Sequence, residues 1–285
     1  MSKIIKVKIA LICVVCLVLS IAGGLLPISA AAKDIEVISI PLYVDGIRAG
    51  NGLKTGSTTY IPLRAFFEAM EVDATINWDA KSKTAVVTAN GLNLEVAADS
   101  QYMNANGRYL YFEDGAKNMN GTMVVPVREL AKSLGVTVIW DEEHWTMNID
   151  TAEIRFIESG ETFYDTEDLF WLSRIISAES SNQPFSGMIA VGNVVLNRVA
   201  DDTMPDTIYD VIFDTKHGVQ FSPITSGSIN NEPLESAVIA AKICLEGYST
   251  VEDSLYFLNP SIADSGWFNR NRVYITSIGD HAFYA

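Results

Sequence analysis

Residues 174–199, RIISAESSNQPFSGMIAVGNVVLNRV, predict two consecutive buried helices with a break at Pro184. In the first helix, apolar residues recur at the spacing of one helix face, and Glu179 falls on that face one turn after Ile175. In the second, over about residues 186–199, nearly every position is apolar, which is typical of a helix buried on several sides. The stretch therefore predicts a helical core that contains a carboxylate.

Glu179 is the candidate catalytic residue of this core. A lone carboxylate on an apolar face is costly when ionised, so we expect its pKa to be raised. A carboxylic acid that is still protonated near neutral pH is what cleavage of a sugar–oxygen bond requires. The alternative is that Glu179 marks the helix end and points into solvent, because helix ends are often polar. The pattern alone leaves both interpretations open.

The surrounding segments predict a mainly helical domain with a small irregular β part. Asp165 or Thr166 can cap the first helix, which ends near Ser180, and Asn231 can cap a later helix that stops at Gly247. The other predicted elements are a helix over residues 206–213, a helix over 231–245, a strand over 255–258 and an aromatic, polar loop over 266–272.

Four blocks of residues follow one another across this half of the chain. They are the Glu179 helix with Gly187 and Asn197-Arg198, then Gln220-Phe221-Ser222-Pro223, then LYFLNP at 255–260 and IGDHAFY at 278–284. From about Tyr164 to Ala285, these blocks resemble the catalytic core of the cell wall hydrolase family typified by the spore cortex-lytic enzymes. The resemblance implies a lysozyme-like fold over residues 164–285 and cleavage of the glycan strands of peptidoglycan.

The carboxylates favour one reaction over another. Ordinary glycosidases use two, and here only Glu179 has a credible buried setting, although Asp264 and Asp280 stay open as second acids. A single general acid/base suits a lytic transglycosylase, which leaves a 1,6-anhydromuramic end, and the family resemblance implies the same mechanism. A hydrolytic muramidase and a wall-binding protein without activity are the alternatives. Whether a second protein restrains the activity is left open.

Other residues of the blocks are candidate substrate ligands. Gln220, Ser222, Tyr256 and Asn259 could hydrogen-bond the sugar, and Phe221, Phe257 and Trp267 could stack on it. His281 is either an orienting residue or a structural histidine, and Asn197 and Arg198 are expected to hold helix ends together. Asn182-Gln183 stands where the family often has Gly-Glu, and Asp280 stands where it often has Asn.

The N-terminus predicts export. Lys3, Lys6 and Lys8 precede an apolar run over residues 9–28 and a cluster of small residues, which is the layout of a signal peptide over residues 1–32. A retained membrane anchor is the alternative. Removal of these residues leaves 17 basic and 35 acidic residues, a formal net charge of −18. Such a surface argues against nucleic acid as a partner. The mature chain keeps one cysteine, Cys244, and cannot form an internal disulfide.

Residues 33–151 contain an internal repeat. IPLRAFFEAM at 61–70 is echoed by VPVRELAKSL at 125–134, and each copy continues to a Trp-Asp pair. Proline suits the first position of each short helix, and Asp-Gly or Asn-Gly pairs at 45, 90, 106 and 120 predict hairpins. We expect small sheets with one short helix each, so that the whole chain has an α+β fold.

The repeat resembles the copper amine oxidase N-terminal domain, here a wall-targeting unit or a spacer. We expect no copper, no other metal and no cofactor, because residues 33–151 contain one histidine and no cysteine. Tyr102, Tyr109 and Tyr111 could stack on sugars, but cross-strand pairing explains them as well. Residues 152–163 are expected to finish a strand at 154–157 and then to form a short polar linker to the second domain.

Overall fold

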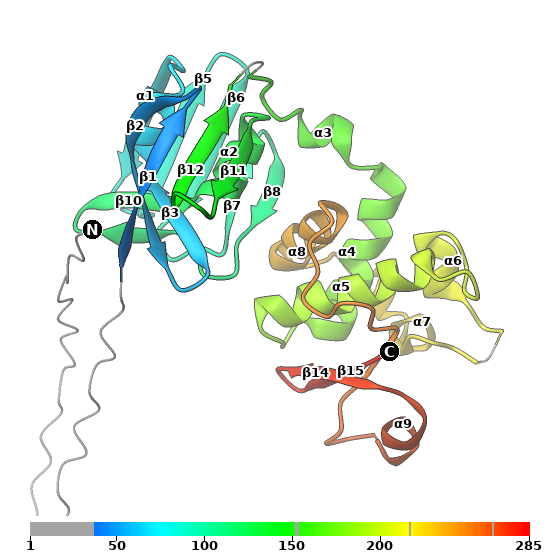
Figure 1. Ribbon diagram of the computed structural model, residues 1–285. Helices are drawn as coiled ribbons and strands as arrows, with labels where there is room; N and C mark the ends of the chain where they lie inside the picture. The colour runs from blue at the N-terminus through cyan, green and yellow to red at the C-terminus, as the bar shows by residue number, and fades with distance from the viewer. Residues whose placement is uncertain (1–36, 152–153, 217, 264) are drawn as a thin grey trace, which may run out of the picture. The chain divides into compact units, whose positions relative to one another are not determined.

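The computed structural model describes residues 37–151, 154–216, 218–263 and 265–285 (Figure 1). The predicted signal peptide therefore lies outside the described residues. Contacts divide the described residues into two compact units: those up to Ala74 with those of Asp114–Arg155, and those of Thr75–Glu113 with those of Phe156–Ala285. Within the described part, no helix is both long enough and apolar enough to cross a membrane.

The first unit is built on the sequence repeat. In each copy a strand ends at a proline, Pro62 or Pro126, which caps a short helix as the residue before its first turn, one position earlier than expected. The two strands pair antiparallel, with Ile61 opposite Val125, so the copies meet side by side. The strands and helices are β3 (Thr58–Pro62), α1 (Leu63–Ala69), β10 (Thr122–Pro126) and α2 (Val127–Ser133).

These strands belong to a seven-stranded sheet in the order β11-β12-β1-β2-β3-β10-β9. β1 runs parallel to β12, with Leu42 opposite Met147, and the other neighbours that pair are antiparallel. Both short helices contact strands of this sheet, so the expectation of one helix per small sheet was wrong. The other strands are β1 (Ile38–Val44), β2 (Ile47–Thr55), β9 (Lys117–Met119), β11 (Thr137–Asp141) and β12 (Thr146–Asp150).

The predicted hairpins form. Asp45-Gly46, Asn106-Gly107 and Asn120-Gly121 have positive φ at both residues, as a type I′ turn requires. At the fourth pair, only Gly91 has a positive φ. Each pair lies between two antiparallel strands, so local turn chemistry sets the register of these hairpins.

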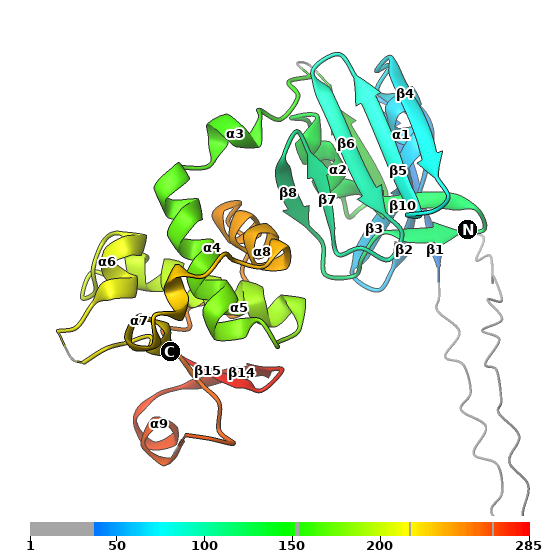
Figure 2. The same cartoon turned by 180° about the vertical axis from the view of Figure 1, so that it is seen from behind.

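A five-stranded sheet in the order β4-β5-β6-β7-β8 belongs to the second unit (Figure 2). Tyr102 lies opposite Tyr111, which confirms the cross-strand interpretation, and Tyr111 is 5% exposed within the core of the helices. The strands are β4 (Ala74–Asp79), β5 (Thr84–Ala89), β6 (Leu92–Ala97), β7 (Tyr102–Ala105) and β8 (Arg108–Tyr111).

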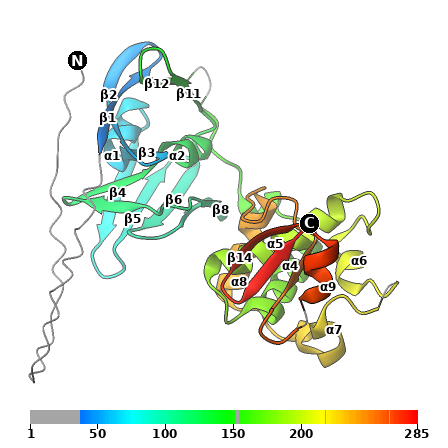
Figure 3. The same cartoon turned by 60° about the horizontal axis from the view of Figure 1, so that its bottom comes forward.

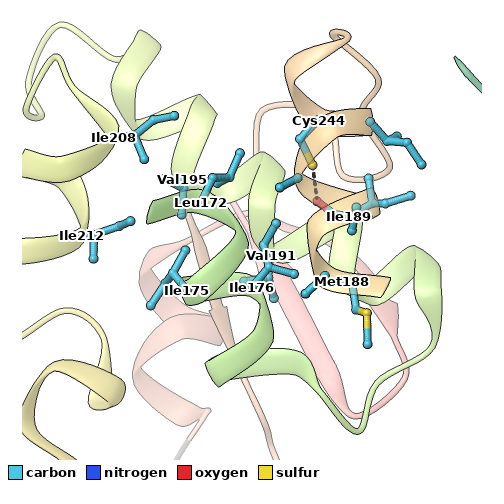
Figure 4. Packing of buried hydrophobic residues seen from close by; sticks show 14 of the residues in the cluster. Leu172, Ile175, Ile176, Met188, Ile189, Val191, Val195, Ile208, Ile212 and Cys244 are labelled. Atoms are coloured by element: carbon cyan, nitrogen blue, oxygen red, sulfur yellow. Dashed lines mark hydrogen bonds between the residues drawn. The ribbon is translucent and has the colours of Figure 1, made fainter. Parts of the chain in front are cut away.

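The helices of the second unit pack around a common core (Figure 4). α4, α5 and α8 cross closely at Gly192, where an added Cβ would lie 2.7 Å from Sγ of Cys244 and 2.8 Å from Cδ1 of Ile176. The Cys244 thiol donates to the carbonyl of Ile189 at 3.3 Å. The helices are α3 (Gly160–Phe163), α4 (Thr166–Ser180), α5 (Phe185–Ala200), α6 (Ile208–Phe213), α7 (Ser222–Ser226), α8 (Glu235–Leu245), α9 (Gly266–Asn271) and the 3-10 turn η1 (Ser228–Asn230).

Several boundaries differ from the sequence prediction. Asn231 does not cap α8, because it is the residue that ends η1, and α8 begins only after Pro233 and Leu234. The stretch expected to be a loop forms α9, and residues 154–157 form no strand. Strands β13 (Tyr256–Leu258), β14 (Tyr274–Ile278) and β15 (His281–Tyr284) form a small sheet in the order β13-β15-β14 beside α5 (Figure 3).

Candidate active site

Glu179 lies in the last turn of α4 and is half-buried, not fully exposed to solvent. The backbone N–H of Ser222 donates a hydrogen bond to its carboxylate. Burial raises the pKa of Glu179, and the Ser222 amide, which favours the ionised form, opposes that shift in part. The arrangement suits a carboxyl group that gives up a proton and takes it back.

The block Gln220-Phe221-Ser222 brings the amide to Glu179. The backbone at Phe221 is extended, so the side chains of Gln220 and Ser222 point away from the side on which the Phe221 ring lies. Phe221 is 1% exposed and belongs to the core, whereas Gln220 and Ser222 are exposed. The buried ring of Phe221 has no free face for the predicted stacking on sugar. The buried ring of Phe221 therefore anchors this segment, and Gln220 and Ser222 on either side of it reach the surface.

Strand β13 carries two more of the predicted residues. Phe257 is half-buried, with its ring centroid 6.4 Å from that of Phe221 and 5.1 Å from that of His281. Tyr256 faces the cations instead: Arg272 donates to its hydroxyl at 2.9 Å, and the Arg198 guanidinium lies 5.6 Å from its ring centroid. Phe257 therefore packs inside while Tyr256 reaches a pocket.

His281 is 8% exposed among aromatic rings, and its Nδ1 has no hydrogen-bond partner among the residues that the structure describes. Burial lowers the pKa of His281, and the charge of Asp280 opposes that shift only in part. These surroundings fit the structural interpretation of His281.

The last two predicted ligands lie elsewhere. Trp267 is 50% exposed on α9, and the side chain of Asn259 accepts from the Ser261 amide at 2.9 Å in a turn.

A pocket of about 690 Å³ opens next to this block. Gln220 and Tyr256 are the predicted residues that line it. Sequence reasoning missed Arg198 as a lining residue. Its Nε donates to the carbonyl of Leu255 at 2.8 Å and so ties the end of α5 to the segment before β13, not to another helix end, and its guanidinium forms part of the pocket wall. Lys216, Asp214 and Arg272 line the same pocket.

Gln183 ties the loop between α4 and α5 to the hairpin of β14 and β15. Its Oε1 accepts from the Asp280 amide at 2.8 Å, and its Nε2 donates to the Asp280 carboxylate at 3.3 Å. The side chain is largely buried. The sequence marks Asn182-Gln183 only as a departure from the family's Gly-Glu, whereas the structure gives Gln183 a role in holding the two segments together.

The two candidate second acids, Asp280 and Asp264, differ in what the structure shows of them. Asp280 is exposed and bound to Gln183, and Asp264 lies outside the described residues. In the part of the chain that the structure describes, no group of three or more His, Cys, Asp or Glu residues could hold a metal ion.

Comparisons with known proteins match both halves of the chain. The family model described as cell wall hydrolase matches residues 182–284, and the copper amine oxidase N-terminal domain model matches residues 51–149. A spore cortex-lytic enzyme from Oceanobacillus iheyensis is 26% identical over 80% of this chain and 75% of its own length. One from Bacillus cereus is 32% identical over 42% of this chain, and less than half of its own length, 45%, is covered.

A solved structure is also similar. The catalytic domain of the germination-specific lytic transglycosylase SleB from Bacillus anthracis is 31% identical, over 45% of this chain and 100% of that domain, with a TM-score of 0.40. The two family matches show that the chain carries a cell wall hydrolase domain in its C-terminal half, preceded by a copper amine oxidase N-terminal domain.

Proposed function

We propose that the chain is an exported lytic transglycosylase that cuts peptidoglycan glycan strands, with Glu179 as its general acid/base. The observation that carries the proposal is the half-buried carboxyl group of Glu179 with its raised pKa and its backbone amide donor. The match to the cell wall hydrolase family and the similarity to spore cortex-lytic enzymes support the substrate. The chain would act in the cell wall or the spore envelope.

The chemistry needs one carboxyl group in two protonation states. Protonated Glu179 donates to the glycosidic oxygen between N-acetylmuramic acid and N-acetylglucosamine, and the bond to the anomeric carbon breaks. The 6-hydroxyl of the same muramic acid then attacks that carbon and returns its proton to Glu179. The product is a 1,6-anhydromuramic end, and no water is consumed. The Ser222 amide stabilises the carboxylate between the two transfers.

Other parts of the chain receive supporting roles. Residues 1–32 would direct export, and residues 33–151 would target the wall or act as a spacer, joined by residues 152–163 to the catalytic domain at 164–285. Gln220, Ser222, Tyr256 and Asn259 are proposed as sugar ligands, with Trp267 as an exposed stacking surface. Gln220 and Tyr256 have support from their place in the pocket wall.

Mass spectrometry of fragments released from purified peptidoglycan by residues 33–285 tests the proposal. Fragments lighter by one water, lost in Glu179→Gln but kept in Glu232→Gln, are expected. Glu232 is a matched control because its side chain is 90% exposed. Reducing-end fragments would instead indicate a hydrolytic muramidase with a second carboxylate. Release from neither vegetative wall nor spore cortex, with wall binding retained, would indicate a binding protein.

A further inference from the structure

The pocket next to the Glu179 region has an excess of positive charge. Arg198, Lys216 and Arg272 line it against one carboxylate, Asp214. The chain as a whole has a formal net charge of −15, so this concentration of cations contrasts with the rest of the molecule. A concave surface with charge of one sign attracts a ligand of the opposite sign.

Arg198 is the buried cation of the pocket, and it is available to bind an anionic ligand. It is 6% exposed, and only its Nε has a hydrogen-bond partner among the described residues. Among the described residues no carboxylate forms a direct ion pair with it, and the charge of Asp214 acts on it only from a longer distance. Its guanidinium lies 5.1 Å from the ring centroid of Phe221 and 5.6 Å from that of Tyr256. Burial of a guanidinium is costly unless an anion pairs with it directly, and its planar donors match a carboxylate.

Arg272 and Lys216 complete the pocket from the surface. Arg272 lies over the ring of Tyr256, 4.4 Å from its centroid, and donates to the tyrosine hydroxyl. Lys216 is exposed, and its backbone amide, not its ammonium group, binds Asp214 at 2.8 Å. One oxygen of the Asp214 carboxylate is therefore occupied by the backbone of its own loop, and the lining of the pocket keeps a net positive charge.

The pocket is close to the proposed acid. Gln220 lines it, and the amide of Ser222 binds Glu179. Two residues of extended chain span at most about 7 Å. A ligand group held in the pocket is therefore within reach of a sugar whose glycosidic bond lies at Glu179.

We propose that this pocket binds a carboxylate carried by the muramic acid of the substrate. The carboxylate belongs either to the free lactyl group or to a peptide attached to it, since both present the same chemistry. The inference rests on the proposed function, because it assigns a substrate group to a pocket of that site. It makes the charge of the glycan a determinant of recognition.

Three glycans test it: strands with their peptides, strands stripped of peptides so that the lactyl carboxylate is free, and stripped strands whose carboxyl groups have been converted to neutral amides. Wild-type protein is expected to cleave the neutral strands with a KM about tenfold higher than that for the charged strands it prefers. Preference for the first glycan identifies the peptide carboxylate, and preference for the second identifies the lactyl carboxylate.

Variants assign the effect to the pocket. Lys216→Gln and Arg272→Gln should each raise KM on the charged strands roughly fivefold and should raise it much less on the neutral strands. Arg270→Gln is the matched control, because Arg270 is exposed on α9 and does not line the pocket. Arg198→Lys keeps the charge but loses the planar donors, so it should weaken the same preference.

Equal KM values for all three glycans, or variants that impair charged and neutral strands alike, would overturn the inference while leaving the proposed function intact. If no glycan is cleaved, the proposed function fails, and binding decides the inference. Glu179→Gln should then bind N-acetylmuramic acid more tightly than N-acetylglucosamine, and Lys216→Gln in that background should abolish the difference. Equal binding of the two sugars would contradict the assignment of the lactyl carboxylate, and equal binding of N-acetylmuramic acid with and without its peptide would contradict that of the peptide carboxylate.

Discussion

At the scale of single residues, Glu179 makes a prediction about stability that is independent of activity. Burial raises its pKa above the ordinary value of 4.5, so the folded protein holds the proton to higher pH than the unfolded chain does. The free energy of unfolding therefore falls as pH rises from 4.5 through the raised pKa. Glu179→Gln removes this loss. The variant should melt at a higher temperature than wild type at pH 8, and the difference should vanish near pH 4.

Glu232→Gln is the control for this comparison, because it removes the same charge from an exposed site. Its melting temperature should follow that of wild type across the range. A Glu179→Gln variant that is less stable than wild type at pH 8 would mean that the Ser222 amide, and not burial, dominates the energy of this carboxylate.

His281 predicts the opposite dependence of the free energy of unfolding on pH. Burial lowers its pKa below the ordinary value of 6.5, so the unfolded chain binds a proton more readily than the folded protein does. The folded protein should lose stability as pH falls below 6.5. His281→Gln cannot be protonated and should remove that part of the slope. Thermal melting of both proteins between pH 5 and pH 8 measures it, and parallel curves would show that the pKa of His281 is the same in the folded and unfolded states.

Some of these residue roles could be predicted from the sequence and others could not. The burial of Glu179 follows from its spacing to Ile175 within one helix. Its partner Ser222 comes from a distant loop, and no local pattern indicates that contact. Arg198 was assigned to a helix end, because the pocket that it lines depends on loops far along the chain. Gln183 was read through the family alone, so its bond to Asp280 was missed.

At the scale of elements, the turn between β14 and β15 fits tightly against the start of α5. Gly279 has φ +58, and an added Cβ would lie 2.3 Å from Oε1 of Gln183 and 2.7 Å from Cδ of Pro184. Gly279→Ala should therefore destabilise the protein by about 2–4 kcal/mol, through backbone strain and displacement of Gln183. Chemical denaturation measures the change.

Gly121→Ala is the matched control for this turn. Gly121 also has a positive φ, +81, but an added Cβ would meet nothing within 4 Å. It should cost about 1–2 kcal/mol, which is the backbone strain alone. Equal costs for the two variants would show that the contact with Gln183 contributes nothing.

Elements with strong local signals were predicted well. The sequence indicates α4 and α5 to within about a residue, because apolar periodicity, the Asp165 cap and Pro184 all act locally. The start of α8 was not predicted, because Asn231 ends η1 instead of capping α8, and tertiary contacts place the start after Leu234. Ser177 Oγ accepts from the Leu234 amide at 3.0 Å and so fixes that start.

At the scale of the molecule, the sequence repeat predicts one N-terminal domain, and the family match over residues 51–149 follows the same division. Contacts group the chain differently, because the five-stranded sheet lies in the same compact unit as the helices. Tyr111 packs on Tyr248, with ring centroids 4.3 Å apart, and Arg108 pairs with Glu246. Such contacts join residues far apart in sequence and leave no periodic signal.

The Arg108–Glu246 pair should be a main stabilising link within that unit. Nε and one terminal nitrogen of Arg108 each lie 2.7 Å from a Glu246 oxygen, and the two side chains are only 10% and 3% exposed. Arg108→Met leaves a buried carboxylate without its cation and should cost about 3–5 kcal/mol, whereas Arg108→Met with Glu246→Leu should recover most of that loss. Chemical denaturation of the three proteins measures both steps. Glu232→Gln, which breaks an exposed pair, should cost less than about 1 kcal/mol. A cost as small for Arg108→Met would mean that solvent reaches this pair, and that the sheet and the helices unfold independently.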